Sequence, residues 1–450
     1  MIDDRANDAL AIAEVALAHA LGQGVSEAEA LVMADDSALT RFANSEIHQN
    51  VAETNVTVNL RVVIGKRVGV ASTDRTDDES LRRLAERATA IAGVVEELED
   101  WGGLPGPTEI RDAPGAYSLG TADASPEFRA EAVRAVIGAA TDAGVTAYGS
   151  FATGTESMAV ANSVGARAAG TRTMSQFITV SMGPGGGSGY AEAAAVDATT
   201  IDAAALGREA AGKARATANA VSIEPGDYPV VLEEYAVVDL LDMLGYLGFS
   251  ALAVQEGRSF VEPGRRIGSD LVTILDDGRD PLGLPLWFDF EGVAKQRVML
   301  VEHGVCRNVV YDAQTAARDG VASTGHGFPA PNPWGPIPLN MFMDAGSASR
   351  EDLIGGLDRG LLVTRFHYTN PVHPKLAIVT GMTRDGTFLV EGGQIVGPVR
   401  NLRYTQSYLA ALAGTVAVAR ERKTLKGSLG GAVVPAIRVD GWTFTGGTEH

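Results

Sequence analysis

In segment 229–249, a short apolar run is followed by a helical pattern of apolar and polar residues. The segment reads PVVLEEYAVVDLLDMLGYLGF. The apolar positions of that pattern recur at spacings of three and four: Val237, Leu240, Leu241, Leu244 and Leu247. Glu234, Asp239 and Asp242 fall between them, so one helix face is apolar and the other is acidic. We therefore predict a strand followed by a helix whose apolar face packs on a core. The segment contains no histidine.

The first half of the chain combines alternating and helical patterns. Within residues 28–70, Val58 and Leu60 fall on one side and Asn59 and Arg61 on the other, as in half-buried antiparallel strands. Thr76 and Glu79 have the spacing of a capping box that opens the next helix. The other predicted elements of this half are a helix at 4–21, a turn at 65–66, a surface connection at 99–120, a helix from Ser125 to Gly144, strands within 146–181 and a helix at 202–220.

The run Glu224-Pro225-Gly226-Asp227 is the clearest interruption in the chain. Because 450 residues exceed what one hydrophobic core supports, we predict two domains, 1–224 and 225–450. The fold class predicted is α+β, with an antiparallel sheet and flanking helices in the first domain and a strand-rich, barrel-like second domain. The elements expected in the second domain are strands at 271–275, 286–290, 296–302 and within 361–400, turns at 385–386 and 392–393, a helix at 405–420 and a final strand pair at 433–446.

Two loops have unusual composition. The glycine-rich run at 183–189 lacks the lysine followed by Ser or Thr that a phosphate-binding loop requires, so we interpret it as a flexible loop. Residues 323–340 contain too much proline for regular structure and are expected to form a binding loop or a buried lining. We hypothesise that both loops border one peptide-binding groove.

The charge balance restricts the possible partners. The chain has 56 acidic and 37 basic residues, which gives a formal charge of −19. This negative charge argues against direct binding of nucleic acid. Cys306 is the only cysteine, so the chain cannot form an internal disulfide or a multi-cysteine metal site. No run of about 18 apolar residues predicts a membrane span, and the amino terminus does not resemble a signal peptide. We expect a soluble, cytoplasmic protein.

Familiar catalytic signatures are missing from the sequence. None of the seven histidines is followed by glutamate, as a zinc-binding helix of the common hydrolase type would require. Four histidines, His303, His326, His367 and His373, gather in the second half with Cys306. Such histidines can bind a metal, line a peptide site or simply hold structure through hydrogen bonds, and the sequence leaves these alternatives open.

Arg258 and Ser259 form a further candidate. They could donate hydrogen bonds to a carboxylate or to the backbone of a peptide. An ordinary ion pair between Arg258 and Glu256 or Glu262 explains the arginine equally well.

The chain resembles the TldD/PmbA family, whose members were once named modulators of DNA gyrase. The resemblance covers nearly the full length and lies in the order and spacing of several stretches rather than in one motif. These stretches are NSEIHQNV with GKRVGVAST, NSVGARAAGTRT, PGDYPVVL, GRSF, FDFEGVAKQRV, YDAQTAARDGVASTGHG, RGLLVT, GTFLVEGGQIVGPVRNLRYTQSYL and VPAIRVDGWTFTG.

The family resemblance carries functional expectations. TldD-like members have a His-Glu-x-x-x-His zinc motif on the helix after the domain joint, whereas PmbA-like (TldE) members lack it. Here that helix has apolar or acidic residues instead, so the resemblance implies a TldE-like subunit without catalytic residues or a metal of its own, inactive alone. It further implies a heterodimer with a TldD-like metallopeptidase that carries the zinc, processing of extended or unfolded peptides, and homodimers in isolation.

The peptide-binding candidates are Arg258, Ser259, His326, His367 and His373. One alternative is a self-sufficient metallopeptidase with a non-standard metal site at His326, His367 and His373. A second alternative is a regulatory protein that acts on DNA gyrase. Zinc analysis and co-purification would separate these hypotheses.

Overall fold

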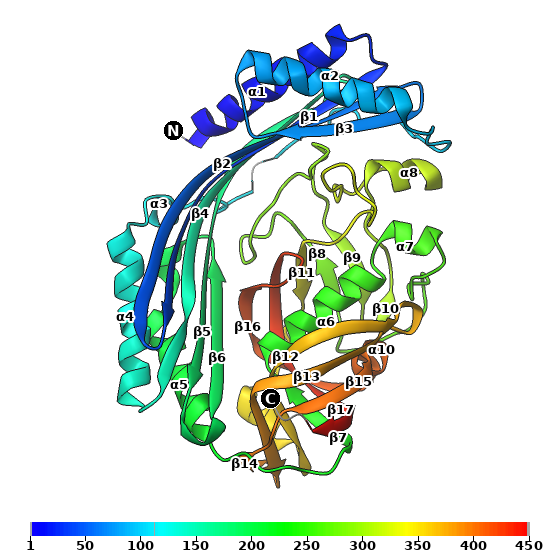
Figure 1. Ribbon diagram of the computed structural model, residues 1–450. Helices are drawn as coiled ribbons and strands as arrows, with labels where there is room; N and C mark the ends of the chain where they lie inside the picture. Colours follow the sequence, from blue (N-terminus) through cyan, green and yellow to red (C-terminus); the bar gives the residue numbers. More distant parts are fainter. Residues whose placement is uncertain (1, 112, 448–450) are drawn as a thin grey trace.

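The computed structural model describes residues 2–111 and 113–447, so residue 1 and residues 448–450, the outer ends of the two predicted domains, lie outside the described residues. Two β-sheets, each with helices, make up the molecule (Figure 1). This arrangement confirms the predicted α+β fold class. The boundary at 224 and 225 stays a prediction, although the chain passes from one sheet to the other between residues 195 and 226.

The first sheet is antiparallel and has the strand order β3-β2-β1-β4-β5-β6. Its strands are β1 (Glu27–Ala43), β2 (Glu46–Ile64), β3 (Arg67–Thr73), β4 (Thr146–Asn162), β5 (Arg167–Met182) and β6 (Ser188–Ala195). The long strands curve around the second half of the chain (Figure 1). The predicted alternation is therefore realised in strands that have one face toward helices and the other toward the second half.

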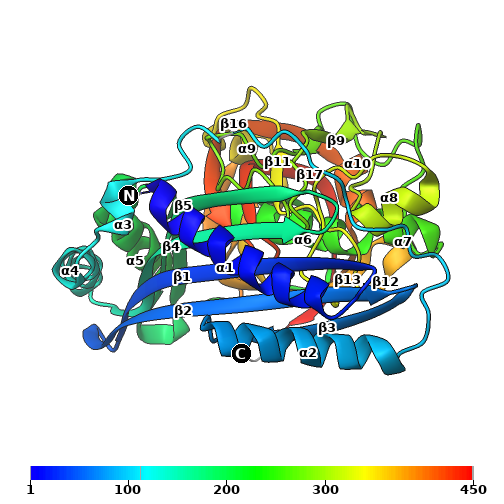
Figure 2. The same ribbon diagram turned by 90° about the horizontal axis from the view of Figure 1, so that it is seen from above.

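Helices cover the outer face of this sheet. They are α1 (Ile2–Gly22), α2 (Asp78–Val94), α3 (Leu119–Ala122), α4 (Pro126–Asp142) and α5 (Ala203–Ala216). Val32, Val58 and Leu60 pack under α1 and α2, while Leu31 and Met158 lie on the opposite face, in a cluster with residues 286–288. Figure 2 shows α1 and α2 on one side of the sheet and the second half on the other.

Two local expectations in the first half are wrong. Asp77, not Thr76, caps α2: its Oδ1 accepts a hydrogen bond of 3.0 Å from the Ser80 backbone N–H. An aspartate carboxylate is as good a cap as a hydroxyl and also favours the positive end of the helix dipole. The connection at 99–120 is not wholly on the surface, because Leu104, Ala113 and Ala116 are buried.

The second sheet has the order β10-β9-β8-β11-β17-β15-β13-β12-β7, with β14 beside β13 and β16 beside β17. Its strands are β7 (Gly226–Leu232), β8 (Ile274–Asp276), β9 (Val298–Glu302), β10 (Val305–Cys306), β11 (Asn340–Met343), β12 (Arg359–His373), β13 (Ile378–Glu391), β14 (Gln394–Pro398), β15 (Leu402–Ser407), β16 (Thr415–Lys426) and β17 (Gly431–Gly447). Because β17 also pairs with β7, strands β7, β12, β13, β15 and β17 form a closed ring. The barrel-like expectation is thereby confirmed.

The helices of the second half are short except for α6. They are α6 (Glu234–Leu247), α7 (Ala251–Gln255), α8 (Ala313–Asp319), α9 (Arg350–Gly355) and α10 (Tyr408–Ala413). The predicted strand and helix at 229–249 are β7 and α6, and α6 packs against β12 and β17. Its acidic face is not solvent-exposed, since Glu234 and Asp242 are 6% and 4% exposed. Polar partners must therefore surround this face.

Four predictions for the second half are wrong. Residues 286–290 form only an isolated bridge between Phe288 and Ala294. Asp385-Gly386 lies inside β13 at a register shift and not in a turn. Of the predicted helix at 405–420 only 408–413 is helical, because residues 405–407 pair with β13 as part of β15 and residues 415–420 pair with β17 as part of β16. The final segment is the single strand β17, which has a register shift between Val439 and Trp442.

None of the helices in the described part of the chain combines the length and apolarity that crossing a membrane requires.

Candidate functional site

Helix α6 is the element on which the family resemblance would place zinc ligands, and its N-terminal end carries a cluster of charged side chains. Glu233 occupies the N-cap position of this helix without a capping hydrogen bond from its side chain, which is 1% exposed. Its Oε2 lies 2.6 Å from Lys213 Nζ on α5, and its Oε1 accepts a hydrogen bond from Arg350 on α9. Both carboxylate oxygens therefore contact protein cations.

Lys423 on β16 forms the other side of this cluster. Its Nζ lies 4.0 Å from Glu234, 3.3 Å from Glu209 on α5 and 2.9 Å from the Tyr235 hydroxyl. Although burial opposes it, the ammonium groups of Lys213 and Lys423 lower the pKa of Glu209 to about 2. The carboxyl groups of Glu233 and Glu234 thus face lysine and arginine side chains. We call these residues, together with Arg350, the α6 charge cluster.

The α6 charge cluster does not fit a zinc site. Zinc prefers neutral imidazole, thiolate or carboxylate ligands that are free to turn toward the metal. No histidine lies on α6. Within residues 2–111 and 113–447, no group of three or more His, Cys, Asp or Glu side chains is arranged to hold a metal ion.

Farther along α6, two carboxyl groups are buried without a direct cation. Asp239 accepts hydrogen bonds from the Tyr408 hydroxyl at 2.9 Å and the Thr369 hydroxyl at 3.0 Å, and burial raises its pKa to about 6. Asp242 accepts from the Ser428 backbone N–H at 2.6 Å, and burial raises its pKa to about 7. These groups tie α6 to β12, α10 and the turn before β17.

A groove of about 540 Å³ lies between the inner face of the first sheet and residues 286–290. We call it the sheet groove. Its apolar lining is Met33, Met158, Met174, Leu286, Trp287, Phe288 and Phe290. Its polar lining includes Asp35, Thr57 and the pair Glu156 and Arg172, whose atoms Oε2 and Nη2 are 2.6 Å apart. Such a lining suits a ligand with apolar side chains on an extended backbone.

Gly170 on β5 allows Trp287 to approach the sheet. A Cβ atom at this position would lie 2.3 Å from Trp287 Cζ2, closer than atoms pack. The indole therefore rests directly on the strand backbone and forms one wall of the groove.

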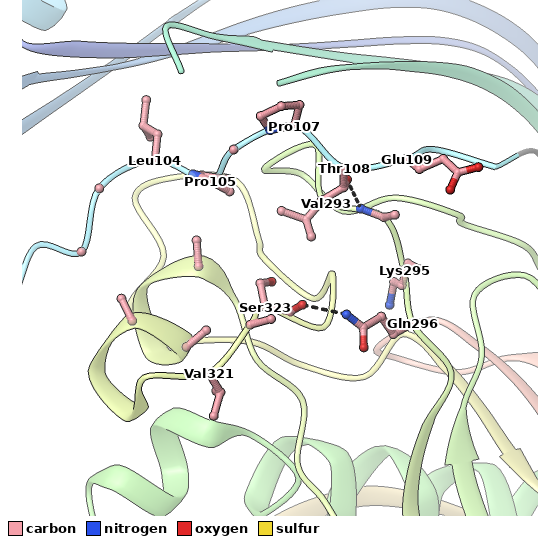
Figure 3. A pocket seen from close by; sticks show the side chains of 18 of the residues that line it. Leu104, Pro105, Pro107, Thr108, Glu109, Val293, Lys295, Gln296, Val321 and Ser323 are labelled. Atoms are coloured by element: carbon pink, nitrogen blue, oxygen red, sulfur yellow. Dashed lines mark hydrogen bonds between the residues drawn. The ribbon is translucent and has the colours of Figure 1, made fainter. Parts of the chain in front are cut away.

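A second cavity of about 600 Å³ shares Trp287 with the sheet groove. Figure 3 shows this second cavity. Residues 102–111 cross it as an extended strap, opposite residues 293–296, α8 and residues 321–323. The Ala294 backbone N–H donates to Thr108 Oγ1 at 2.9 Å, and Gln296 Nε2 donates to the Ser323 carbonyl at 3.1 Å. The glycine-rich loop at 183–189 lines a different cavity, together with Asn219 and Arg400. Neither this loop nor the proline-rich loop at 323–340 lines the sheet groove.

The structure places His326 in a wholly buried polar group. Its Nε2 lies 2.9 Å from Asp276 Oδ1, and its Nδ1 lies 2.9 Å from Thr324 Oγ1. Lys295 Nζ is 3.4 Å from the same Asp276 oxygen. Burial, followed by the charge of Lys295, lowers the pKa of His326. His326 is therefore a neutral, hydrogen-bonded part of the core at pH 7.

The other histidines are dispersed. His303 is in the turn after β9, with its Nδ1 3.2 Å from the Asp270 carbonyl, while Cys306 is buried in β10. His367 lies on β12 opposite Met382. His373 Nδ1 accepts a hydrogen bond of 3.3 Å from the Leu376 backbone N–H. The three-histidine metal site of the alternative hypothesis is thus absent from the described residues, in agreement with their lack of any metal-binding group.

Arg258 and Ser259 have structural partners. Arg258 Nε is 2.5 Å from Glu256 Oε2, which is one of the two ion pairs weighed from the sequence. Ser259 Oγ donates to the Gly248 carbonyl at 2.7 Å and accepts from the Val261 N–H at 2.9 Å. The peptide-binding role of these residues and of the three histidines stays a prediction.

Sequence reasoning missed a buried group between the two halves. Arg61 Nη2 on β2 donates to Glu29 Oε1 at 2.7 Å and to Glu291 Oε1 at 3.1 Å. Burial, reinforced by Glu291 and Asp289, raises the pKa of Glu29 to about 8 although Arg61 opposes the shift. The alternation of β2 places Arg61 on the polar face, but nothing in the sequence indicates a partner 230 residues away.

Comparison with known proteins identifies two matching domains and similar structures. Residues 225–446 match the PmbA/TldA metallopeptidase C-terminal domain, and residues 28–92 match the PmbA/TldA metallopeptidase domain 1. A metalloprotease TldD homolog from Buchnera aphidicola subsp. Acyrthosiphon pisum is 29% identical over 186 residues, 39% of this chain and 37% of that protein. The match thus spans little more than a third of that relative's length.

Two solved structures share the fold over nearly the whole chain. TldE from Thermococcus kodakarensis has a TM-score of 0.88 and 22% identity, over 96% of this chain and 99% of that one. A protein named as a modulator of a DNA gyrase, from Thermotoga maritima, has a TM-score of 0.85 and 21% identity over the same shares. At these identities the likeness shows the fold alone.

Proposed function

Since this chain belongs to the PmbA/TldD metallopeptidase family, we propose that it is a TldE-like subunit that pairs with a TldD-like zinc metallopeptidase. The proposed heterodimer binds extended or unfolded peptides and processes them at the zinc site of the partner. In this arrangement the present chain supplies binding surface and contributes no catalytic residue. A homodimer forms when the partner is absent.

The observation that carries the proposal is the chemistry at the start of α6. A metallopeptidase needs a cation that lowers the pKa of bound water. Here Glu233 and Glu234 face Lys213, Arg350 and Lys423 instead, and the helix has no histidine. Removing a buried carboxylate from such a partner to bind a metal would leave an uncompensated charge, which costs about 3 to 5 kcal/mol.

The sheet groove supports a peptide-binding role. Its three methionines are flexible, polarisable side chains that adapt to different apolar groups. Trp287 and Phe290 add rigid aromatic surface, whereas Asp35 and Thr57 offer polar atoms along the strands. This combination favours extended segments of varied sequence over one small molecule.

The test is purification of the full-length chain, carrying an affinity tag, from extracts of its native cells. We expect a TldD-like chain to co-purify, zinc to be present in the complex and not in the isolated chain, and peptide hydrolysis by the complex alone. Chelation should abolish that hydrolysis. Zinc and chelator-sensitive hydrolysis in the isolated chain would instead favour the self-sufficient metallopeptidase, and co-purification of gyrase would favour the regulatory alternative.

A further inference from the structure

The outward side of strands β12, β13 and β15 carries three arginines, and we propose that it binds an acidic segment of the peptide substrate. We call it the basic face and define it by Arg365, His367, Met382, Arg384 and Arg403. The inference rests on the proposed function, because it names the class of peptide that the subunit would recruit. In Figure 1 these strands lie side by side below α6.

The strand register places the five residues on one side of the sheet. His367 pairs with Met382, which pairs with Arg403, and Arg365 pairs with Arg384. Directly opposed residues of antiparallel strands project to the same face, as do residues two apart in a strand. The intervening residues Phe366 and Tyr404 point the other way and are buried. The basic face therefore points away from the core, with Arg403 exposed and Arg365 partly covered by Tyr190 of β6.

The positive charge of this face is only partly compensated. Arg365 is bound to Asp385, with Nε 2.7 Å from Oδ2, and its guanidinium lies 4.4 Å from the ring centroid of Tyr190. Arg384 has the same carboxylate as its nearest acid, at 4.0 Å. Arg403 is exposed and forms no ion pair among the residues that the structure describes. The Asp385 carboxylate thus faces two of the three guanidinium groups, those of Arg365 and Arg384.

The charges of Arg384 and Arg365 also act on His367. Its pKa is lowered by burial and then by the charges of Arg384 and Arg365, against the opposing effect of Asp385. A neutral imidazole at pH 7 adds no further charge, so the arginines dominate the face. In a chain with 19 more acidic than basic residues, such a region attracts anions that the rest of the surface repels.

The spacing of the arginines matches an extended acidic peptide. Arg384 and Arg403 are diagonal neighbours across β13 and β15, which places their Cβ atoms roughly 7 to 8 Å apart. Alternate residues of an extended chain are separated by about 6.6 Å. Two carboxylates at positions i and i+2 can therefore meet both guanidinium groups, while Met382 between them offers an apolar contact.

The surroundings of the face add a second recognition element. Tyr368 is the next residue after His367, and its side chain is 75% exposed, with a backbone φ of 59°. A left-handed conformation is unfavourable for tyrosine, so the backbone holds this aromatic ring outward at an energetic cost. His373, the other histidine candidate of this strand, is also exposed on β12.

The experiment measures fluorescence anisotropy of the full-length chain with two capped, fluorescein-labelled decapeptides. One alternates Glu and Thr, and the other alternates Lys and Thr. We expect the acidic peptide to bind, with affinity falling as salt is raised from 50 to 300 mM. Arg403→Glu should weaken this binding at least tenfold, and Met382→Lys should strengthen it.

The matched control is Arg134→Glu. Arg134 is exposed on α4, on the far side of the first sheet, and forms no ion pair within the described residues. It makes the same change in net charge, so we expect less than a twofold effect on peptide binding. Thermal unfolding of both variants, within 2 °C of the parent chain, would verify that they fold.

Three outcomes would overturn the inference. They are no binding of the acidic peptide, equal effects of Arg403→Glu and Arg134→Glu, and loss of partner co-purification with Arg403→Glu while peptide binding persists. The last result would assign the face to the subunit interface and leave the proposed pairing intact. Conversely, Arg403-dependent peptide binding without any TldD-like partner would sustain this inference and refute the proposed pairing.

Discussion

Replacement of Glu29 by glutamine should remove a specific part of the pH dependence of stability. Glu29 lies on β1 beside Arg61 of β2, which also binds Glu291, and burial raises the pKa of the Glu29 carboxyl from 4.5 to about 8. The native state therefore retains a proton that the unfolded chain has lost between these two pH values. Because the unfolded state binds fewer protons there, the free energy of unfolding falls as pH rises.

The magnitude follows from this proton difference. One proton corresponds to about 1.4 kcal/mol per pH unit. Between pH 5.5 and 7.5 the parent chain should therefore lose about 2 to 3 kcal/mol relative to Glu29→Gln, since the amide cannot ionise. Comparing the two proteins at each pH cancels the contributions of groups that do not interact with Glu29. Asp289, whose pKa is raised to about 7 by burial and by Glu291, also interacts with Glu29, so its titration contributes to the difference between the two proteins.

The assay is urea unfolding at several pH values, followed by tryptophan fluorescence. Trp101 is a local reporter, because the Arg61 guanidinium carbon lies 5.6 Å from the centroid of its ring. Glu53→Gln, at an exposed position of β2, is the control and should change stability by less than about 0.5 kcal/mol at each pH. A difference between the parent chain and Glu29→Gln that does not vary with pH would refute the reasoning. Glu29 would then be an ordinary ionised partner of Arg61.

Three further predictions concern the α6 charge cluster and the sheet groove. Lys213→Met leaves Glu233 without one of its two cations, so we expect a loss of roughly 3 kcal/mol in thermal unfolding; an unchanged melting temperature would contradict the buried pair. Gly170→Ala places a Cβ against the indole ring across the groove and should cost about 1 to 3 kcal/mol, whereas Gly138→Ala on α4, where nothing lies within 4 Å, should not destabilise. Met174→Asp should weaken binding of an apolar peptide about tenfold in anisotropy titrations, because the lost apolar contact contributes about 1.4 kcal/mol to the binding free energy. Unchanged binding would show that peptides bind elsewhere.

Local sequence patterns predicted the strands and helices of this chain best where one face of the element is apolar. The alternation in β2 gave the correct face for Val58 and for Arg61, because each side chain in a strand has only two directions available. The prediction of a helix at residues 415–420 was wrong because tertiary contacts outweigh the helical propensity of this segment. Pairing with β17 determines the conformation of that segment.

The glycine at 386 shows a related limit. An Asp-Gly pair between apolar runs is a strong hairpin signal. In the structure Asp385 has φ of 56° and Gly386 has φ of 141°, so the pair forms an irregularity within β13. This conformation directs the Asp385 carboxylate to Arg365 and to Ser188 of the other sheet. The Asp-Gly pair thus forms a contact between segments that are distant in the sequence. No local sequence pattern specifies such a contact.

The candidate site was less predictable than the fold. Nearness in sequence suggested a histidine group, but His326 is buried beside Asp276 while His367 and His373 lie on β12. The partners that determine the role of a polar residue are 50 or more positions away in several cases, such as His326 with Asp276 and Arg61 with Glu291. Only the absence of histidine from α6 could be established from the sequence alone.

The α6 charge cluster explains why a divalent metal would be unfavourable at the start of this helix. Three carboxylates, Glu209, Glu233 and Glu234, face three cations, Lys213, Arg350 and Lys423, so the cluster is balanced. Adding a divalent ion would leave two excess positive charges in a buried region unless lysines lost their protons or moved to solvent. Substituting both lysines by methionine would reverse the balance to two excess negative charges. If the double variant then bound a divalent cation while the parent chain did not, the lysines would be identified as the groups that exclude it.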